Sequence, residues 1–122
     1  MSSTLSIGTA GEDIAAQFLK YVGYAIWDRN VRIERDEIDI VAYDPKDDVV
    51  AFVEVKTRSK KDEFYRPELN VDVRKRRALH RAATRWITMH NEERGFRVDL
   101  ICVADGTVTD HWKQIDCAVV ED

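Results

Sequence analysis

The sequence predicts an α/β fold, in which a mixed five-stranded sheet is flanked by helices in the order α-β-β-β-α-β-β. Apolar residues recur every three to four positions in two segments, and they alternate or run together in five shorter ones. The chain of 122 residues is 44% hydrophobic and 34% charged. It can therefore bury one core, and we expect a single domain over residues 1–122.

Two segments have the apolar spacing of one helix face. The first covers residues 9–22, and Gly23 is suited to end it in a left-handed conformation. The second covers residues 71–93 and is the longest predicted element, with Gly95 as its stop. Its apolar face consists of Leu79, Ala82, Ala83, Trp86, Ile87 and His90.

Five segments have the pattern of β-strands. The segment 49–57 is apolar on both faces in its first half, which favours a central position in the sheet. The pair Asp105-Gly106 is typical of a tight hairpin turn, so the last two strands should be neighbours. The predicted strands cover residues 24–33, 37–43, 49–57, 96–104 and 107–115, with turns at residues 34–36 and 44–48.

The composition excludes several classes of protein. The longest apolar runs have five residues, far fewer than the roughly 18 of a membrane-spanning helix. The first residues lack the basic and apolar regions of a secretory signal. Cys102 and Cys117 are too few for a disulfide framework. We therefore expect a cytoplasmic protein that makes no membrane contact.

The net charge of −4 hides an uneven distribution. Residues 56–85 contain eleven basic and four acidic residues, whereas the rest of the chain contains eight basic and nineteen acidic ones. A basic band on an acidic body is typical of a surface that binds phosphates, although a solvated helix face has the same pattern. We expect a mobile basic loop at residues 59–70 and a flexible segment at residues 1–7.

Charged residues interrupt the predicted central strand. Because side chains alternate along a strand, Glu54, Lys56 and Arg58 share the face of Phe52. In a simple meander, Asp39 of the preceding strand lies beside Glu54. Neighbouring carboxylates repel, and a divalent cation such as Mg²⁺ relieves the repulsion, while Lys56 could orient or deprotonate a water. A surface ion pair between Glu54 and Lys56 explains the same pattern without any chemistry.

Alternation also assigns faces to other strand residues. It places Ile38 and Ile40 together on the face opposite Asp39. For Asp99, in the middle of a strand, we expect a structural ion pair. Nothing in the sequence arranges the tryptophans as a base-stacking platform, and we interpret all three as core or interface residues: Trp27, Trp86 and Trp112.

Several helical residues allow two interpretations. Glu12 either forms a capping box with Thr9 or points towards the sheet and joins the carboxylates. Lys75 continues the apolar face of the second helix and should point towards the sheet, although a lysine at a helix start can also snorkel to solvent. A ridge of arginines on this helix is either solvated or faces phosphates: Arg74, Arg77, Arg81 and Arg85.

Four stretches, together with Lys75 followed by Leu79 and Ala83, carry a resemblance to a known family. The stretches are GTAGEDIA (residues 8–15), DEIDI (36–40), FVEVKTR (52–58) and RVDL (97–100). With them, the chain resembles the YraN-like family of small bacterial proteins. That family is similar to the archaeal Holliday junction resolvases of the PD-(D/E)XK nuclease superfamily. The resemblance implies a restriction-endonuclease-like core.

The resemblance also implies roles for individual residues. Asp39, Glu54 and Lys56 correspond to the catalytic residues of the superfamily, and Asp39 and Glu54 to metal ligands that Glu12 joins. Two positions depart from the family pattern. Ile38 precedes Asp39 where the superfamily name has proline, and Asp36 stands where the family usually has glycine.

From these residues we expect a metal-dependent DNA phosphodiester hydrolase, an endonuclease that acts on structured or branched DNA with Mg²⁺ or Mn²⁺. It would contact the DNA backbone with weak sequence preference, and a homodimer would supply two sites for cutting both strands. The alternatives are a non-catalytic nucleic-acid-binding module on the same fold and a domain that binds an acidic protein. The residues expected to bind DNA are Arg58, Lys60, Lys61, Arg74, Lys75, Arg77 and Arg81.

Overall fold

The computed structural model describes residues 7–58 and 73–115. The elements follow the predicted order α-β-β-β-α-β-β. Of the expected flexible segment 1–7, only Ile7 is described, and it begins the first helix. The expected basic loop at 59–70 lies outside the described residues. The elements are α1 (Ile7–Tyr21), β1 (Ala25–Ile33), β2 (Asp36–Asp44), β3 (Val49–Arg58), α2 (Val73–Met89), β4 (Gly95–Ala104) and β5 (Thr107–Trp112).

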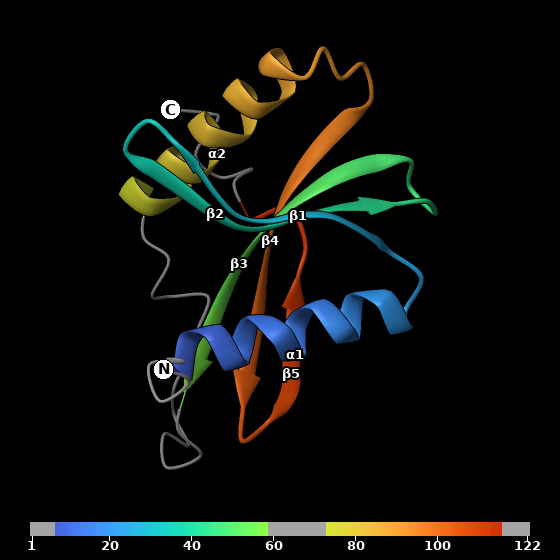
Figure 1. The fold of residues 1–122 in the computed structure, drawn as a ribbon, viewed down its shortest axis with the longest axis vertical. Coiled ribbons are helices and arrows are strands. Elements are labelled where there is room, and N and C mark those ends of the chain that lie inside the picture. The colour runs from blue at the N-terminus through green and yellow to red at the C-terminus, as the bar shows by residue number, and fades with distance from the viewer. Residues whose placement is uncertain (1–6, 59–72, 116–122) are drawn as a thin grey trace.

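The five strands form one sheet in the order β1-β2-β3-β4-β5. The pair β3–β4 is parallel and the other three pairs are antiparallel, so the predicted mixed sheet is confirmed. One helix covers each face, and both helices begin on the left of the view in Figure 1. No helix among the described residues is long and apolar enough to cross a membrane.

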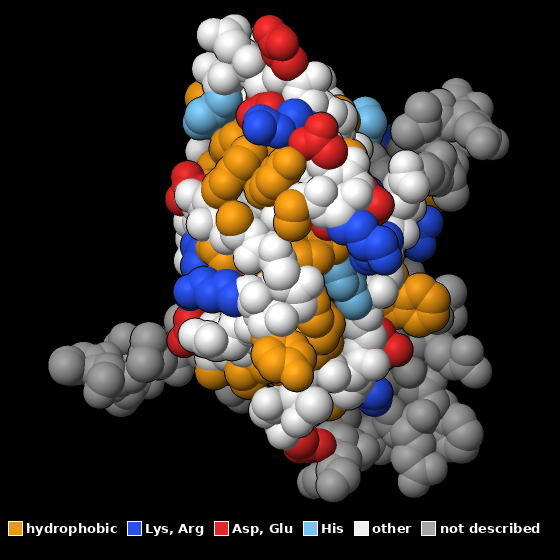
Figure 2. Space-filling view, turned by 90° about the vertical axis from the view of Figure 1, so that its right-hand side faces the viewer, with side chains coloured by type: hydrophobic (Ala, Val, Ile, Leu, Met, Phe, Trp, Pro, Cys, Tyr) orange, Lys and Arg blue, Asp and Glu red, His pale blue; other side chains and the backbone are white. Residues whose placement is uncertain are grey.

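Both helices end at a residue in the left-handed conformation, which is a glycine after α1 and an asparagine after α2. In α1, Gly23 adopts a φ of 106°, and the Tyr24 N–H donates to the Leu19 carbonyl at 2.8 Å, as predicted. Tyr21 is left 90% exposed, and the side of the molecule where α1 ends shows hydrophobic side chains between scattered charged ones (Figure 2).

The predicted end of α2 at residue 93 is wrong. Asn91 takes the left-handed conformation, with a φ of 51°, and the Glu92 N–H donates to the Ile87 carbonyl at 3.0 Å. Asparagine tolerates this conformation better than other non-glycine residues, so the helix ends at Met89. Gly95 begins β4 instead of stopping the helix.

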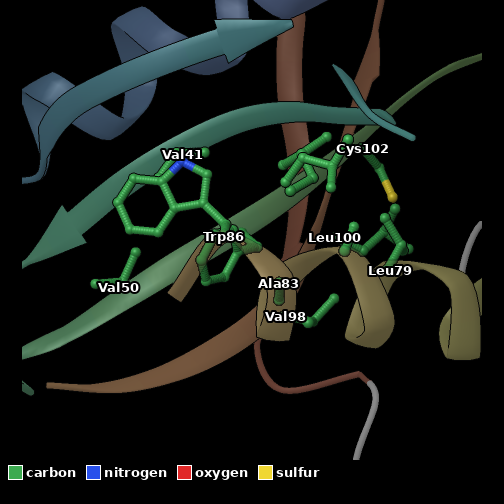
Figure 3. Close-up of a cluster of buried hydrophobic side chains, with 12 residues drawn as sticks. Val41, Val50, Leu79, Ala83, Trp86, Val98, Leu100 and Cys102 are labelled. Carbon is green, nitrogen blue, oxygen red and sulfur yellow. The ribbon is translucent and has the colours of Figure 1, made fainter. Parts of the chain in front are cut away.

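The core lies on both faces of the sheet. Beneath α2, Leu79, Ala83 and Trp86 pack on the sheet (Figure 3), and the Trp86 ring meets Phe52 edge-on at 5.5 Å. His90, which we expected on this apolar face, is exposed and stacks on Trp86 from outside at 3.9 Å. Beneath α1, the cluster consists of Ala15, Ala16, Leu19, Tyr24, Ile40, Ala42, Ala51, Val53, Ile101 and Val103.

A buried ion pair within β4 connects this strand to the end of β2 and to the turn after β5, which confirms the expected role of Asp99. The Arg97 Nε donates to the Asp99 carboxylate at 2.9 Å, and Arg97 also lies 3.2 Å from Asp44 at the end of β2. The Gln114 N–H donates to Asp99 at 3.1 Å, and Gln114 has a φ of 58°. This turn ends β5 at Trp112, three residues before the predicted end.

Helix α1 approaches β3 very closely at Gly11. A Cβ built on Gly11 would overlap the hydroxyl oxygen of Thr57, whereas the Cβ of Thr57 itself would lie at an ordinary 3.5 Å. A larger residue at position 11 therefore requires the Thr57 hydroxyl to move away from this turn of α1. The contact also sets the position of Glu12, the next residue along the helix.

We predict that Gly11→Ala lowers the free energy of unfolding by up to about 2 kcal/mol, measured by urea denaturation. Overlap in a packed contact costs about 1–3 kcal/mol, more than the roughly 1 kcal/mol that alanine gains over glycine within a helix. In a Thr57→Ala background the oxygen is absent, so the same exchange should stabilise the protein. An equal loss in both backgrounds would contradict this account.

Candidate active site

The site lies where β2 and β3 part. Their pairing runs from Asp44↔Val49 to Ile40↔Val53 and stops there, while β3 continues beside β4 as far as Arg58. Beyond the last pair, the Asp39 carboxylate accepts a hydrogen bond from the Val55 N–H at 2.8 Å. The next residues of the two strands are Asp39 and Glu54, so the structure brings together the two carboxylates that alternation placed side by side.

The expectation that Ile38 and Ile40 share a face is wrong. Ile38 belongs to the buried cluster beneath α2, and Ile40 to the cluster beneath α1. Between them, β2 has lost β3 as a neighbour and pairs only with β1. The alternation of side chains along β2 is therefore interrupted at Asp39. The Asp39 carboxylate accepts the hydrogen bond from the Val55 N–H that a backbone carbonyl of β2 would otherwise accept.

Glu54 is a buried acid in an unfavourable position. Its relative exposure is 7%, and burial, followed by repulsion from Asp39, raises the pKa of Glu54 to about 7. Lys75 and Lys56 partly oppose this rise. Burial also raises the pKa of Asp39, against the hydrogen bond from the Val55 N–H. Near neutral pH the pair therefore carries less than its full negative charge unless a cation joins it.

Two lysines flank the pair from different elements. Lys75, in the first turn of α2, has its Nζ 3.8 Å from Glu54 Oε2, so it points towards the sheet as the helical spacing indicated. Lys56 follows Glu54 on the same strand face and lowers the pKa of both carboxyls. The positive charges compensate the two acids only in part, because the pKa of each acid stays raised.

Glu12 approaches the pair from α1. Of the two interpretations of Glu12, the capping box with Thr9 does not hold, because α1 begins at Ile7 and Thr9 lies within it. Burial, followed by the charge of Asp39, raises the pKa of Glu12. Its Oε1 is buried and accepts no hydrogen bond from the described residues, although the Arg29 guanidinium lies 3.8 Å away.

The donor set suits a hard divalent cation. Asp39 and Glu54 offer carboxylate oxygens, the Val55 carbonyl directly follows Glu54 in the sequence, and the Glu12 oxygen lacks a donor among the described residues. Within residues 7–58 and 73–115, no three Asp, Glu, His or Cys side chains are grouped closely enough to hold one ion. Mg²⁺ commonly uses one or two carboxylates and keeps several waters, so Asp39 and Glu54 fit it as a pair, and Glu12 is an additional oxygen nearby.

Part of the predicted arginine ridge is paired with acids. Arg81 holds Asp36 through two hydrogen bonds of 2.9 Å each, which lower the pKa of Asp36. Arg85 lies 3.1 Å from Glu34. Asp36, the residue that departs from the family pattern, is thus buried, and its ion pair with Arg81 connects the β1–β2 turn to α2. Its partner is 45 residues away, a separation at which sequence spacing gives no signal.

The remaining DNA-binding candidates differ in placement. Arg58 ends β3 and is half-buried, and Lys60 and Lys61 lie outside the described residues. Arg74 and Arg77 line an open groove of about 920 Å³ with Lys75 and Arg81. The groove also includes Arg35 of the β1–β2 turn, which the sequence analysis missed because an isolated turn arginine has no periodic pattern.

The tryptophans do not line this groove. Trp86 is buried beneath α2, as expected. Trp27, which is 41% exposed, stacks on Tyr43 at 5.3 Å with an angle of 3° between the rings. The Arg94 guanidinium lies over both rings, so this cluster consists of contacts within the protein.

Comparison with known proteins adds the family. Over residues 11–103 the sequence matches the Uncharacterised protein family UPF0102. The chain belongs to this family. The match confirms the resemblance to the YraN-like proteins, and it spans Glu12, Asp39, Glu54, Lys56 and all of α2.

Individual UPF0102 proteins are similar over most of their length. The relative from Pelobacter propionicus is 41% identical over 103 residues, covering 81% of this chain and 72% of the relative. The relative from Chloroherpeton thalassium is 38% identical, covering 84% and 78%. The relative from Paenarthrobacter aurescens is 41% identical, covering 85% and 84%.

The carboxylate pair predicts a pH dependence of stability in metal-free buffer. An acid whose pKa is raised on folding favours the folded state at low pH, and that contribution is lost as pH rises through the folded pKa. For Glu54 the window runs from its ordinary 4.5 to about 7. Between pH 5 and pH 8 the wild type should lose up to about 3 kcal/mol relative to Glu54→Gln, measured by urea denaturation at each pH.

The comparison with Glu54→Gln isolates this carboxyl, because all other titrating groups are common to both proteins. A stability difference between the two proteins that stays constant from pH 5 to pH 8 would contradict the raised pKa. A loss of stability below pH 4 that is equal in both proteins would come from acids whose pKa is lowered, such as Asp36.

Proposed function

We propose that this UPF0102 protein is a metal-dependent DNA phosphodiester hydrolase that cuts structured or branched DNA. The observation that carries the proposal is the Asp39–Glu54 pair, two acids whose burial raises their pKa values and which lie side by side where β2 and β3 part. Bringing acids together in a protein is unfavourable unless a cation or a proton compensates them. Strongly perturbed acids beside lysines are typical of catalytic sites.

The position of each residue in the site indicates its role in the proposed reaction. Asp39 and Glu54 would hold Mg²⁺ or Mn²⁺, which when bound lowers the pKa of a water and neutralises charge on a phosphate. The Val55 N–H keeps the Asp39 carboxylate oriented. Lys56, on the face of Glu54, is placed to orient or deprotonate the attacking water. Lys75, 3.8 Å from Glu54, is placed to bind a non-bridging oxygen of the phosphate.

Branched DNA is favoured by the similarity of the YraN-like family to Holliday junction resolvases. That part of the proposal rests on the analogy of fold and motif. The structure supports DNA independently through the basic groove, because Lys75 belongs both to the groove and to the carboxylate pair.

A second candidate is a nucleic-acid-binding module without catalysis. It is favoured by the contact between Lys75 and Glu54, which compensates part of the buried charge without a metal. It is also favoured by the absence, among the residues described, of three ligating side chains grouped around one point. In this case DNA binding would survive neutralisation of Glu54.

We predict cleavage of a labelled four-way junction with Mg²⁺ or Mn²⁺, compared with flap, duplex and single-stranded DNA in the same assay. Asp39→Asn, Glu54→Gln and Lys56→Ala should each lower the cleavage rate at least 100-fold, because each removes a metal ligand or the proton-transfer group. Glu93→Gln is the matched control, since it removes the same charge at an exposed position after α2.

Cleavage that persists in Glu54→Gln would rule out this site and point to a contaminating nuclease. If no substrate is cut, while DNA binds equally to the wild type and to Glu54→Gln, the non-catalytic module is the correct account.

A further inference from the structure

The groove beside the candidate site is strongly cationic. It lies between the β1–β2 turn and the first turns of α2, and five of its lining residues are basic. No acidic residue occurs in the first turn of α2. The charged residues that line the groove are Arg35, Arg74, Lys75, Arg77, Arg81 and Asp36.

Arg81 neutralises Asp36, the one acid among the described residues that line the groove. Arg81 donates two hydrogen bonds to the Asp36 carboxylate. The positive and negative charges of this pair cancel, so the pair adds no net charge to the groove. The pair also fixes the β1–β2 turn, which carries Arg35, against α2. Neither Arg35 nor Arg74 is in an ion pair with a residue that the structure describes, so both guanidinium groups are available to an anion.

The described part of the groove lacks the groups that usually bind single strands. Among the residues that the structure describes, its apolar lining consists of Val73 and Ala78, with no aromatic ring. Proteins that hold single-stranded DNA stack its bases on aromatic side chains. The exposed ring of Trp27 lies elsewhere, stacked on Tyr43 beneath Arg94. A groove of cations without rings matches the phosphate backbone of a duplex.

We infer that this groove binds the backbone of a double-stranded DNA arm next to the phosphodiester at the Asp39–Glu54 pair. Arg35 from the turn and Arg74 from the helix contact its phosphates from opposite walls. Lys75 connects the groove to the carboxylates. The inference rests on the proposed function for the orientation of the arm, whereas the binding itself requires no metal and no cleavage.

The test measures binding in EDTA, so that cleavage plays no part. Fluorescence anisotropy would follow a labelled 20-base-pair duplex and a single strand of the same length from 50 to 300 mM salt. We expect the wild type to bind the duplex at least tenfold more tightly than the single strand. In Arg35→Ala/Arg74→Ala the slope of log K against log salt should fall by about 2, because each lost phosphate contact contributes about 0.9.

Lys20→Ala/Lys113→Ala is the control, since it removes two exposed positive charges outside the groove, and its slope should match the wild type. An unchanged slope in Arg35→Ala/Arg74→Ala would overturn the inference, as would equal affinity for single strand and duplex. Because the assay contains no metal, loss of duplex binding and loss of cleavage remain separate results. Duplex binding through the groove could persist even if the hydrolase proposal failed.

Discussion

The arrangement of the site depends on one hydrogen bond, from the Val55 N–H to the Asp39 carboxylate. At this point β3 still pairs with β4 but has lost β2, and a buried N–H without an acceptor costs about 1–3 kcal/mol. Asp39 supplies the acceptor from the departing strand. The same contact that completes the edge of β3 therefore brings a second carboxylate beside Glu54, and β2 turns there so that Ile38 and Ile40 pack on opposite faces.

The charges around the pair and the raised pKa of Glu54 depend on the point at which β2 and β3 part. Glu54 lies on the face of the central strand that is covered by α2, so it is buried, and Asp39 adds repulsion. Lys75 reaches the pair because α2 begins at the same end of the sheet as the site (Figure 1). Glu12 reaches it because the close contact between Gly11 and Thr57 fixes the start of α1. Four elements, α1, β2, β3 and α2, thus contribute charged side chains to one region of the structure.

Local regularities of the sequence were enough to predict the elements, the mixed sheet and the neighbourhood of Asp39 and Glu54. Alternation holds wherever a strand keeps both neighbours, and it failed at Ile38, where β2 has only one. The end of α2 was misplaced because Asn91 adopts a conformation that we assigned to Gly95. The ion pairs Asp36–Arg81 and Arg97–Asp99 differ in how far they could be predicted from the sequence. The second joins residues two apart and could be anticipated, whereas the first joins residues brought together only by the fold.

The central claim is that Asp39 and Glu54 form a pair that is incomplete without a cation. The most direct measurement follows the side-chain carboxyl carbons by NMR through a pH titration, with and without Mg²⁺. The account predicts that Glu54 titrates near 7 without metal, and that Mg²⁺ lowers its midpoint by more than one pH unit, because the ion competes with the proton. A midpoint near 4.5 that does not respond to Mg²⁺ would contradict it.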